Sequence, residues 1–151
     1  MKLLKTLGDV KTVALDTAPL IYYIEEHKDY IEIIDPLFIQ INQGHIGACT
    51  SVITLIEVLT KPIEAANKIL IGKYEEILTN THNLTVIDID KSIAIESAKL
   101  RAKYTIRTPD AIQMVVGIMN GAKAFITNDH NLKKVKEIRV IVLNDFVMAA
   151  K

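Results

Sequence analysis

The segment Arg107-Thr108-Pro109-Asp110-Ala111-Ile112-Gln113 places a single carboxylate in the first turn of an otherwise apolar helix. Pro109 is typical of the first helical residue, and Thr108 is the expected N-cap. The residues that follow, as far as Met119, are apolar on almost every side, which predicts a buried helix. Asp110 is therefore expected at the edge of the core, beside the free N–H groups of a helix N-terminus. Acids in this position usually only complement the helix dipole, so a functional role for Asp110 requires evidence from other residues of the chain.

The composition is that of an ordinary globular domain. The 151 residues suffice for one α/β domain but not for two, so residues 1–151 are interpreted as a single domain. Hydrophobic residues make up 50% and charged residues 24%, which favours a packed core over disorder. Lys+Arg and Asp+Glu both number 18, so the net charge gives no sign of a nucleic-acid partner. Any such partner must be argued from local patches.

Cysteine content and hydropathy suggest where the protein works. The lone Cys49 excludes an internal disulfide and a thiolate zinc site, and agrees with a reducing compartment. The N-terminal apolar stretch is too short for a signal peptide, and no segment approaches the length of a membrane span. We therefore expect a cytoplasmic protein without a membrane partner.

Strand-like and helix-like segments alternate along the chain. The expected strands cover residues 12–15, 45–49, 84–89, 123–127 and 138–143. The expected helices cover about residues 19–25, 30–43, 52–59, 63–80, 91–104 and 109–119, between a polar lead and a short C-terminal tail. Pro62 is expected to close the third of these helices. This order predicts an α/β fold with a mostly parallel sheet, covered by helices on both faces and joined by right-handed crossovers.

Three acids are expected to meet at one edge of this sheet. Asp16 and Asp129 each follow directly on an apolar strand, at its C-terminal tip. Helix N-termini in such folds face the strand C-termini, which brings Asp110 to the same edge. Ligands of open parallel sheets bind at this edge, where the strand order reverses.

A fourth acid, Glu57, is the only charged residue in the apolar segment from Val52 to Leu59. Burying a lone carboxylate costs several kcal/mol, and no Lys or Arg lies between Val52 and Thr60 to compensate it. A cation shared with the other acids is the simplest compensation. Oxygen ligands without paired His or Cys favour Mg²⁺ or Mn²⁺ over zinc. Several carboxylates around such an ion are typical of phosphoester hydrolysis, by a nuclease or a phosphatase.

Four short motifs together resemble the PIN domain of metal-dependent ribonucleases, which include the VapC-type toxins of toxin–antitoxin pairs. They are Leu15-Asp16-Thr17, Glu57 in its apolar helix, Thr108-Pro109-Asp110-Ala111, and Phe125-Ile126-Thr127-Asn128-Asp129. The resemblance implies a three-layer α/β/α sandwich around a short parallel sheet. It also implies endonucleolytic cleavage of single-stranded RNA with Mg²⁺ or Mn²⁺, a homodimer, and an antitoxin protein as a possible partner.

The resemblance also assigns roles to residues. It implies that the catalytic and metal-binding acids are Asp16, Glu57, Asp110 and Asp129. The supporting polar residues are Thr17, Thr127 and Asn128.

Two basic segments flank the acids and offer a path for RNA. The first contains Lys99, Arg101, Lys103 and Arg107 with Tyr104 among them, and the second contains Lys133, Lys134, Lys136 and Arg139. Such clusters contact phosphates, and a tyrosine stacks on bases. Lys103 and Arg107 are the main candidates for substrate binding. The alternative is that these residues are the cationic last turn of a helix and a solvated loop.

Two other functions compete with a nuclease. A phosphohydrolase of the haloacid-dehalogenase type also uses an Asp after its first strand, but it expects a second Asp two positions later, where this chain has Ala18. The other alternative is a non-catalytic PIN-like module that binds RNA or protein without metal. Metal-dependent activity separates the nuclease from this non-catalytic module.

Overall fold

The computed structural model describes the backbone of residues 2–150 and the side chains of residues 2–147. The described chain forms five strands, eight α helices and one 3-10 helix. The strands are β1 (Thr12–Leu15), β2 (Gly47–Ser51), β3 (Leu84–Ile87), β4 (Ala124–Thr127) and β5 (Arg139–Val142). The helices are α1 (Lys2–Leu7), α2 (Thr17–Ile24), α3 (Ile31–Asn42), α4 (Val52–Glu64), α5 (Lys68–Asn80), α6 (Lys91–Tyr104), α7 (Thr108–Met119), α8 (Asn144–Ala150) and the 3-10 helix η1 (His130–Lys134). None of the described helices has the length and apolar character needed to cross a membrane.

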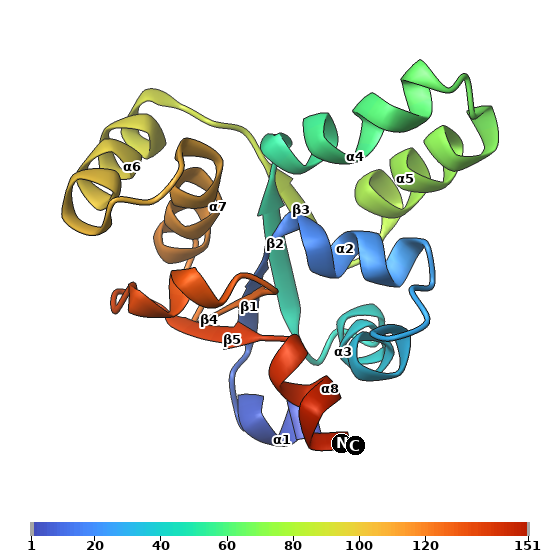
Figure 1. The fold of residues 1–151 in the computed structure, drawn as a ribbon, viewed down its shortest axis with the longest axis horizontal. Coiled ribbons are helices and arrows are strands. Elements are labelled where there is room, and N and C mark those ends of the chain that lie inside the picture. The colour runs from blue at the N-terminus through green and yellow to red at the C-terminus, as the bar shows by residue number, and fades with distance from the viewer. Residues whose placement is uncertain (1, 151) are drawn as a thin grey trace.

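The five strands form one sheet in the order β3-β2-β1-β4-β5, and every neighbouring pair is parallel (Figure 1). The expected mostly parallel sheet is therefore confirmed. β1 lies in the centre, with β2 on one side and β4 on the other. The strand order reverses between β1 and β4, so the edge beyond their C-terminal ends is the expected position of a ligand site.

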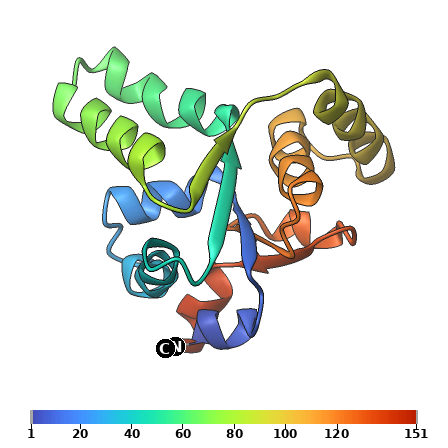
Figure 2. The same cartoon turned by 180° about the vertical axis from the view of Figure 1, so that it is seen from behind.

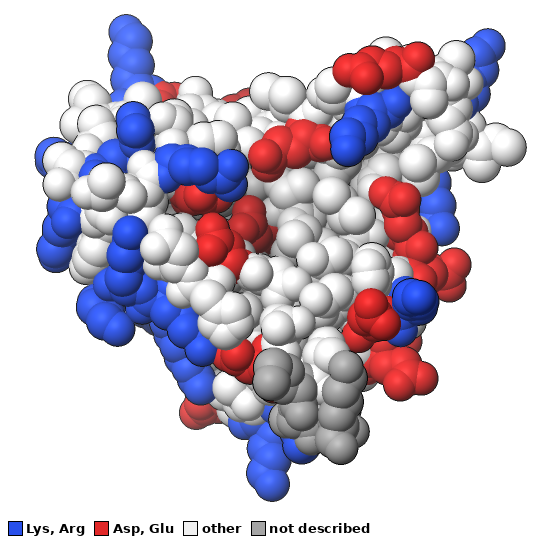
Figure 3. Space-filling model, viewed as in Figure 1, with Lys and Arg blue, Asp and Glu red and all other residues white. Residues whose placement is uncertain are grey.

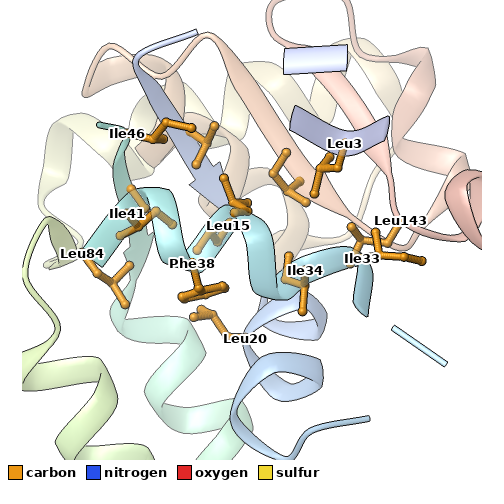
Figure 4. Packing of buried hydrophobic residues seen from close by; sticks show 14 of the residues in the cluster. Leu3, Leu15, Leu20, Ile33, Ile34, Phe38, Ile41, Ile46, Leu84 and Leu143 are labelled. Atoms are coloured by element: carbon orange, nitrogen blue, oxygen red, sulfur yellow. The ribbon is translucent and has the colours of Figure 1, made fainter. Parts of the chain in front are cut away.

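Helices cover both faces of the sheet, as the alternating side chains of its central strands show. Val13 and Leu15 of β1 belong to a core cluster that includes residues of α1 to α5, whereas Ala14 faces a second cluster with α6 and α7. Figures 1 and 2 show these two groups of helices on opposite sides of the sheet. In the larger cluster, Phe38 of α3 lies near Leu20 of α2 (Figure 4). The three-layer α/β/α arrangement is thus confirmed.

The two ends of the chain differ from the expectation. The polar lead is the helix α1, whose Leu3 and Leu7 are buried on one face at an i, i+4 spacing. The expected C-terminal tail is the helix α8, which begins at Asn144. The two helices α1 and α8 lie side by side (Figures 1 and 2). α1 leads into the N-terminal end of β1, whereas α8 begins just beyond the C-terminal tip of β5, where the Asn144 N–H donates to Asn128 at 2.8 Å.

Some helix boundaries also differ from the prediction, among them the end of α4 and the start of α7. Pro62 lies inside α4, which continues to Glu64, and the chain turns only at Ala66, whose φ is +52°. A proline near the end of a helix removes only one hydrogen bond, so it did not stop α4 at once. Thr108 is the first residue of α7 and not its N-cap; Arg107 holds that position without a side-chain capping bond.

The contact between α7 and β1 is unusually close. A Cβ added at Gly117 of α7 would lie 2.5 Å from the Cβ of Ala14 in β1. Gly117 therefore allows the helix to rest directly on the central strand. This contact fixes the position of α7, which begins beside the C-terminal edge of the sheet.

We expect Gly117→Ala to lower the free energy of unfolding by about 1–3 kcal/mol, because the added methyl overpacks the contact with Ala14. Urea denaturation measures the change. Gly72→Ala is the matched control, since Gly72 lies inside α5 with nothing within 4 Å of an added Cβ. There the better helix propensity of alanine should raise stability by about 0.5–1 kcal/mol. A Gly117→Ala protein as stable as the parent would contradict the tight contact.

Candidate active site

A pocket of about 430 Å³ opens at the C-terminal edge of β1 and β4. Its lining includes all four predicted acids, all three supporting residues and the cation of Arg107: Asp16, Thr17, Glu57, Arg107, Asp110, Thr127, Asn128 and Asp129. In Figure 3, acidic side chains gather in a hollow on this face, with many Lys and Arg side chains on the α6 and α7 side. The fold thus brings together acids that are far apart in the sequence.

Asp16 lies at the tip of β1 and is half-buried. It caps α2 by accepting a hydrogen bond from the Thr17 N–H at 2.9 Å, and the Thr127 hydroxyl donates to its other oxygen at 2.7 Å. Burial raises the pKa of Asp16 to about 6, and the charges of Asp110 and Glu57 add to this rise. The two hydrogen bonds oppose it. Asp16 is therefore a carboxylate held in an environment that disfavours its charge.

Asp110 is buried at the start of α7, with 6% of its surface exposed. The exposed Arg107 lies one turn earlier and donates two hydrogen bonds to the Asp110 carboxylate, from Nε to Oδ2 at 3.0 Å and from Nη2 to Oδ1 at 3.3 Å. Among the residues lining the pocket, Arg107 is the only Lys or Arg. The predicted substrate-binding arginine is therefore also the counter-charge of a predicted metal ligand.

Glu57 reaches the pocket in a different way from that expected. The sequence predicted a buried carboxylate, but Glu57 is exposed, and α4 buries only the stripe of Thr54, Val58 and Pro62. The other sides of α4 are not buried. Because the Glu57 carboxylate is exposed, no burial cost has to be compensated by a cation. Glu57 instead lies at the rim, where the Thr17 hydroxyl donates to its Oε1 at 2.6 Å.

Asp129 and Asn128 lie in the turn after β4. Asp129 caps η1 by accepting from the Asn131 N–H at 2.9 Å, and its own N–H donates to the Thr127 hydroxyl at 3.1 Å. Asn128 donates to the Tyr22 hydroxyl at 3.1 Å. These bonds tie the turn to α2 and to β4, and the supporting roles of Thr127 and Asn128 stay predictions.

Lys103 lies outside the pocket. Its ammonium group pairs with Glu137 at 3.2 Å, and the Tyr104 hydroxyl donates to the same carboxylate. The structure therefore separates the two cations that the sequence grouped together. Arg107 faces the acids, whereas Lys103 and Tyr104 face the loop before β5.

Sequence reasoning missed the polar side chains beneath the pocket, above all Gln113. This residue is 2% exposed, and its amide contacts Ser51, Thr54 and Thr17. A signal was present, because Gln113 lies three residues after Asp110 and is the only other polar side chain between Asp110 and Met119. Such spacing places the two on one face of the helix.

The donor set suits a hard divalent cation, because four carboxylates line one pocket and two of them raise the pKa of a third. In the present arrangement, no three His, Cys, Asp or Glu residues of the described chain lie together as a ligand set. Asp110 is turned toward Arg107 and Glu57 toward Thr17. Metal binding would therefore require these side chains to rearrange.

Fold and site together define a class of α/β proteins with carboxylates at the reversal point of a parallel sheet. The family model described as PIN domain matches residues 13–138 of this chain. The chain therefore belongs to the PIN domain family. No match is found among curated proteins.

Three solved structures have a similar fold. VapBC2 from Rickettsia felis, bound to a DNA fragment from its promoter, has a TM-score of 0.69 at 18% identity, covering 87% of this chain and 98% of that one. DNA-bound VapBC from Salmonella typhimurium has a TM-score of 0.69 at 21% identity, covering 89% and 98%. A toxin–antitoxin complex from Klebsiella pneumoniae has a TM-score of 0.65 at 21% identity, covering 88% and 98%. At these identities the likeness shows the fold.

The raised pKa of Asp16 predicts how the stability of the metal-free protein depends on pH. Between the unfolded value of 3.8 and the folded value of about 6, the folded state binds more protons, so its stability falls as the pH rises. From pH 5 to pH 8 this group should cost the parent roughly 1–1.5 kcal/mol of unfolding free energy. Urea denaturation in EDTA at both pH values measures this loss.

Asp16→Asn is the control, because an amide does not titrate in this range. Its stability should fall less than that of the parent between pH 5 and pH 8. If the two proteins lose the same amount, Asp16 is not the group with the raised pKa.

Proposed function

We propose that this protein is a divalent-metal-dependent endoribonuclease that cleaves single-stranded RNA. The observation that supports it best is the meeting of Asp16, Glu57, Asp110 and Asp129 in one pocket at the C-terminal edge of the sheet. Membership of the PIN domain family adds to this support, since the resemblance noted from the sequence implies such an activity.

The four acids would hold Mg²⁺ or Mn²⁺. When bound, such an ion supplies a hydroxide nucleophile and stabilises the displaced oxygen of the phosphodiester. The protein contributes the placement of the ligands. Asp16 is held by Thr127 and by the first N–H of α2, and Glu57 is held by Thr17. Because these donors are neutral, they orient the carboxylates without cancelling their charge.

Arg107 is suited to bind a phosphate of the substrate. Its two bonds to Asp110 use Nε and one N–H of Nη2, so three of the five guanidinium N–H groups remain for a further acceptor. Arg107 also lines a second pocket of about 570 Å³ together with Arg101, on the surface of α6. A strand that crosses from this pocket to the acids would pass Arg107. This path replaces the one through Lys103 expected from the sequence.

We further propose that the protein is a toxin of the VapC type, with an antitoxin protein as its partner and a homodimer as its assembly. The three similar structures are toxin–antitoxin complexes by their names, and this chain covers 98% of each similar chain. The exposed apolar side chains Ile56 and Ile63 of α4 are 62% and 58% exposed, which offers a surface for such a partner.

The proposed activity predicts that the purified protein cleaves single-stranded RNA in Mn²⁺ or Mg²⁺ and stops in EDTA. Asp16→Asn and Asp110→Asn should each reduce the cleavage rate by more than the roughly 10–100-fold typical of losing an outer-shell partner of a metal. A gel assay with end-labelled RNA measures the rate. Thermal melting checks that both variants remain folded.

Asp29→Asn is a matched control, because Asp29 is exposed and lies outside the pocket. It should cleave like the parent. Cleavage that survives EDTA would contradict metal dependence, and RNA binding without cleavage at any metal concentration would favour the non-catalytic module.

The proposed substrate path predicts a role for Arg107 in binding. With EDTA present to prevent cleavage, Arg107→Gln should weaken RNA binding and lower the slope of log K against log salt by about 0.7, the value for one phosphate contact on a single strand. Fluorescence anisotropy at several salt concentrations measures both.

Lys103→Gln is the matched control, because it makes the same change of charge outside the pocket. Lys103 pairs with Glu137. Because an exposed pair of this kind contributes little, RNA affinity should change by less than about twofold. If Lys103→Gln lowers the slope and Arg107→Gln does not, the strand runs over the other face of α6.

A further inference from the structure

We infer that Gln113 is a positioning residue, which directs the Thr17 hydroxyl onto Glu57 and so prepares Glu57 as a metal ligand. This inference rests on the proposed function, because it gives Glu57 a role in metal binding. Gln113 touches neither the pocket nor the acids. Its effect would pass through Thr17, which lines the pocket and contacts both Gln113 and Glu57.

The orientation of the Gln113 amide follows from its neighbours. The backbone N–H of Ser51 lies 3.2 Å from Oε1 and is a group that only donates. The Ser51 hydroxyl accepts from the Ile53 N–H and donates to the same Oε1 at 2.6 Å. The amide oxygen must therefore face Ser51, at the junction of β2 and α4. Its NH₂ group must face the opposite way, toward Thr54 and Thr17.

The two protons of this NH₂ group have separate acceptors. Nε2 lies 2.8 Å from the Thr54 hydroxyl oxygen and 3.2 Å from that of Thr17. With its two acceptor sites occupied by Ser51, Gln113 uses its whole hydrogen-bonding capacity. It joins α7, α2 and the β2–α4 junction in one buried network. No side-chain N or O buried within the described residues lacks a hydrogen-bond partner.

The remaining hydroxyl protons can then be placed one by one. Thr50 donates to the carbonyl oxygen of Leu15 at 2.9 Å, because a carbonyl only accepts. Thr50 has no second proton, so Thr54 must donate in their mutual contact at 2.8 Å. One branch of the network therefore runs from Gln113 through Thr54 and Thr50 to the backbone of β1.

The other branch ends at Glu57. Thr17 accepts from Gln113 and donates its only proton to Glu57 at 2.6 Å. The Thr17 and Thr54 oxygens lie 3.1 Å apart, and each already gives its proton elsewhere, so Gln113 holds two acceptors side by side. If the Gln113 amide were removed, Thr17 and Thr54 would be free to bond to each other. The Thr54 oxygen would then compete with Glu57 for the Thr17 proton.

Glu57 depends on this single bond. Within residues 2–147, Thr17 is the only hydrogen-bond donor to its carboxylate, and Glu57 is otherwise exposed on α4. Loss of the bond leaves a flexible side chain to be ordered when a cation binds. Outer-shell partners that orient metal ligands typically contribute about 10–100-fold in metal affinity, which sets the scale of the expected effect.

The test is the Mn²⁺ dissociation constant, measured by EPR titration of free Mn²⁺ without RNA. We expect Gln113→Met, which keeps the length of the side chain, and Thr17→Val, which removes the hydroxyl, each to weaken binding by about 10-fold. Because both changes break the same path, the double variant should bind no more weakly than Thr17→Val alone. Thr17→Ser keeps the hydroxyl and should restore the affinity of the parent.

Thr54→Val is the matched control, because Thr54 is equally buried and bonds to Gln113 but lies on the branch that ends at β1. It should lower the melting temperature and leave the Mn²⁺ dissociation constant within about twofold of the parent. A purely structural role for Gln113 would give Gln113→Met the same behaviour as Thr54→Val, and this would overturn the inference.

Two further outcomes remain distinct. If the Gln113→Met and Thr17→Val losses multiply in the double variant, Gln113 does not act through Thr17, and the inference is wrong although the metal site stands. If the parent itself binds no Mn²⁺, the proposed function fails first and the inference falls with it.

Should Gln113→Met not fold, Gln113→Asn replaces it, because its amide is one methylene too short to reach Ser51 and Thr17 together. A parent-like dissociation constant in that variant would also overturn the inference.

Discussion

The close approach of α7 to the central strand is the contact on which the site depends. Gly117 leaves no room for a side chain against Ala14, so the height and rotation of α7 over the sheet are fixed at that point. Residues four and seven positions earlier lie on the same helix face. These are Gln113 and Asp110, and the rise of 1.5 Å per residue carries Asp110 about 10 Å toward the strand tips. One packing contact in the core thus places a carboxylate in the lining of the pocket and an amide beneath it.

Much of this arrangement could be predicted from the sequence, for a definite reason. Asp16 and Asp129 follow apolar strands directly, and parallel strands bring their C-terminal ends to one edge, so their meeting follows from local pattern alone. Glu57 was found by a wrong argument, since α4 is apolar on sides that face solvent and Glu57 is exposed. The partners of Gln113 could not be assigned, because Ser51, Thr54 and Thr17 are distant in sequence and none of them signals burial by itself. Hydrogen-bond partners across elements are a property of the packed fold.

The neutral net charge hides a strong separation of charge. Lys+Arg and Asp+Glu both number 18, yet the residues lining the pocket include four carboxylates and one guanidinium. Many of the cations lie instead on α6, in η1 and after η1, around the hollow and not within it (Figure 3). A nucleic acid is attracted by such a rim, whereas a divalent cation is attracted by the centre. The net charge of the whole chain therefore says little about what each part of the surface attracts.

The choice of donors around the acids explains how the fold keeps that charge available. Pairing each carboxylate with a lysine would favour folding, but it would neutralise the pocket and leave nothing for a cation to compensate. Hydroxyl groups and backbone N–H groups offset part of the desolvation cost while leaving the negative charge in place. The pKa of Asp16, raised to about 6 despite two hydrogen bonds, measures what remains uncompensated. The single guanidinium of Arg107 donates its hydrogen bonds to the most buried of these carboxylates, Asp110, and one positive charge faces four acids, so the site retains a net charge that a bound cation would stabilise.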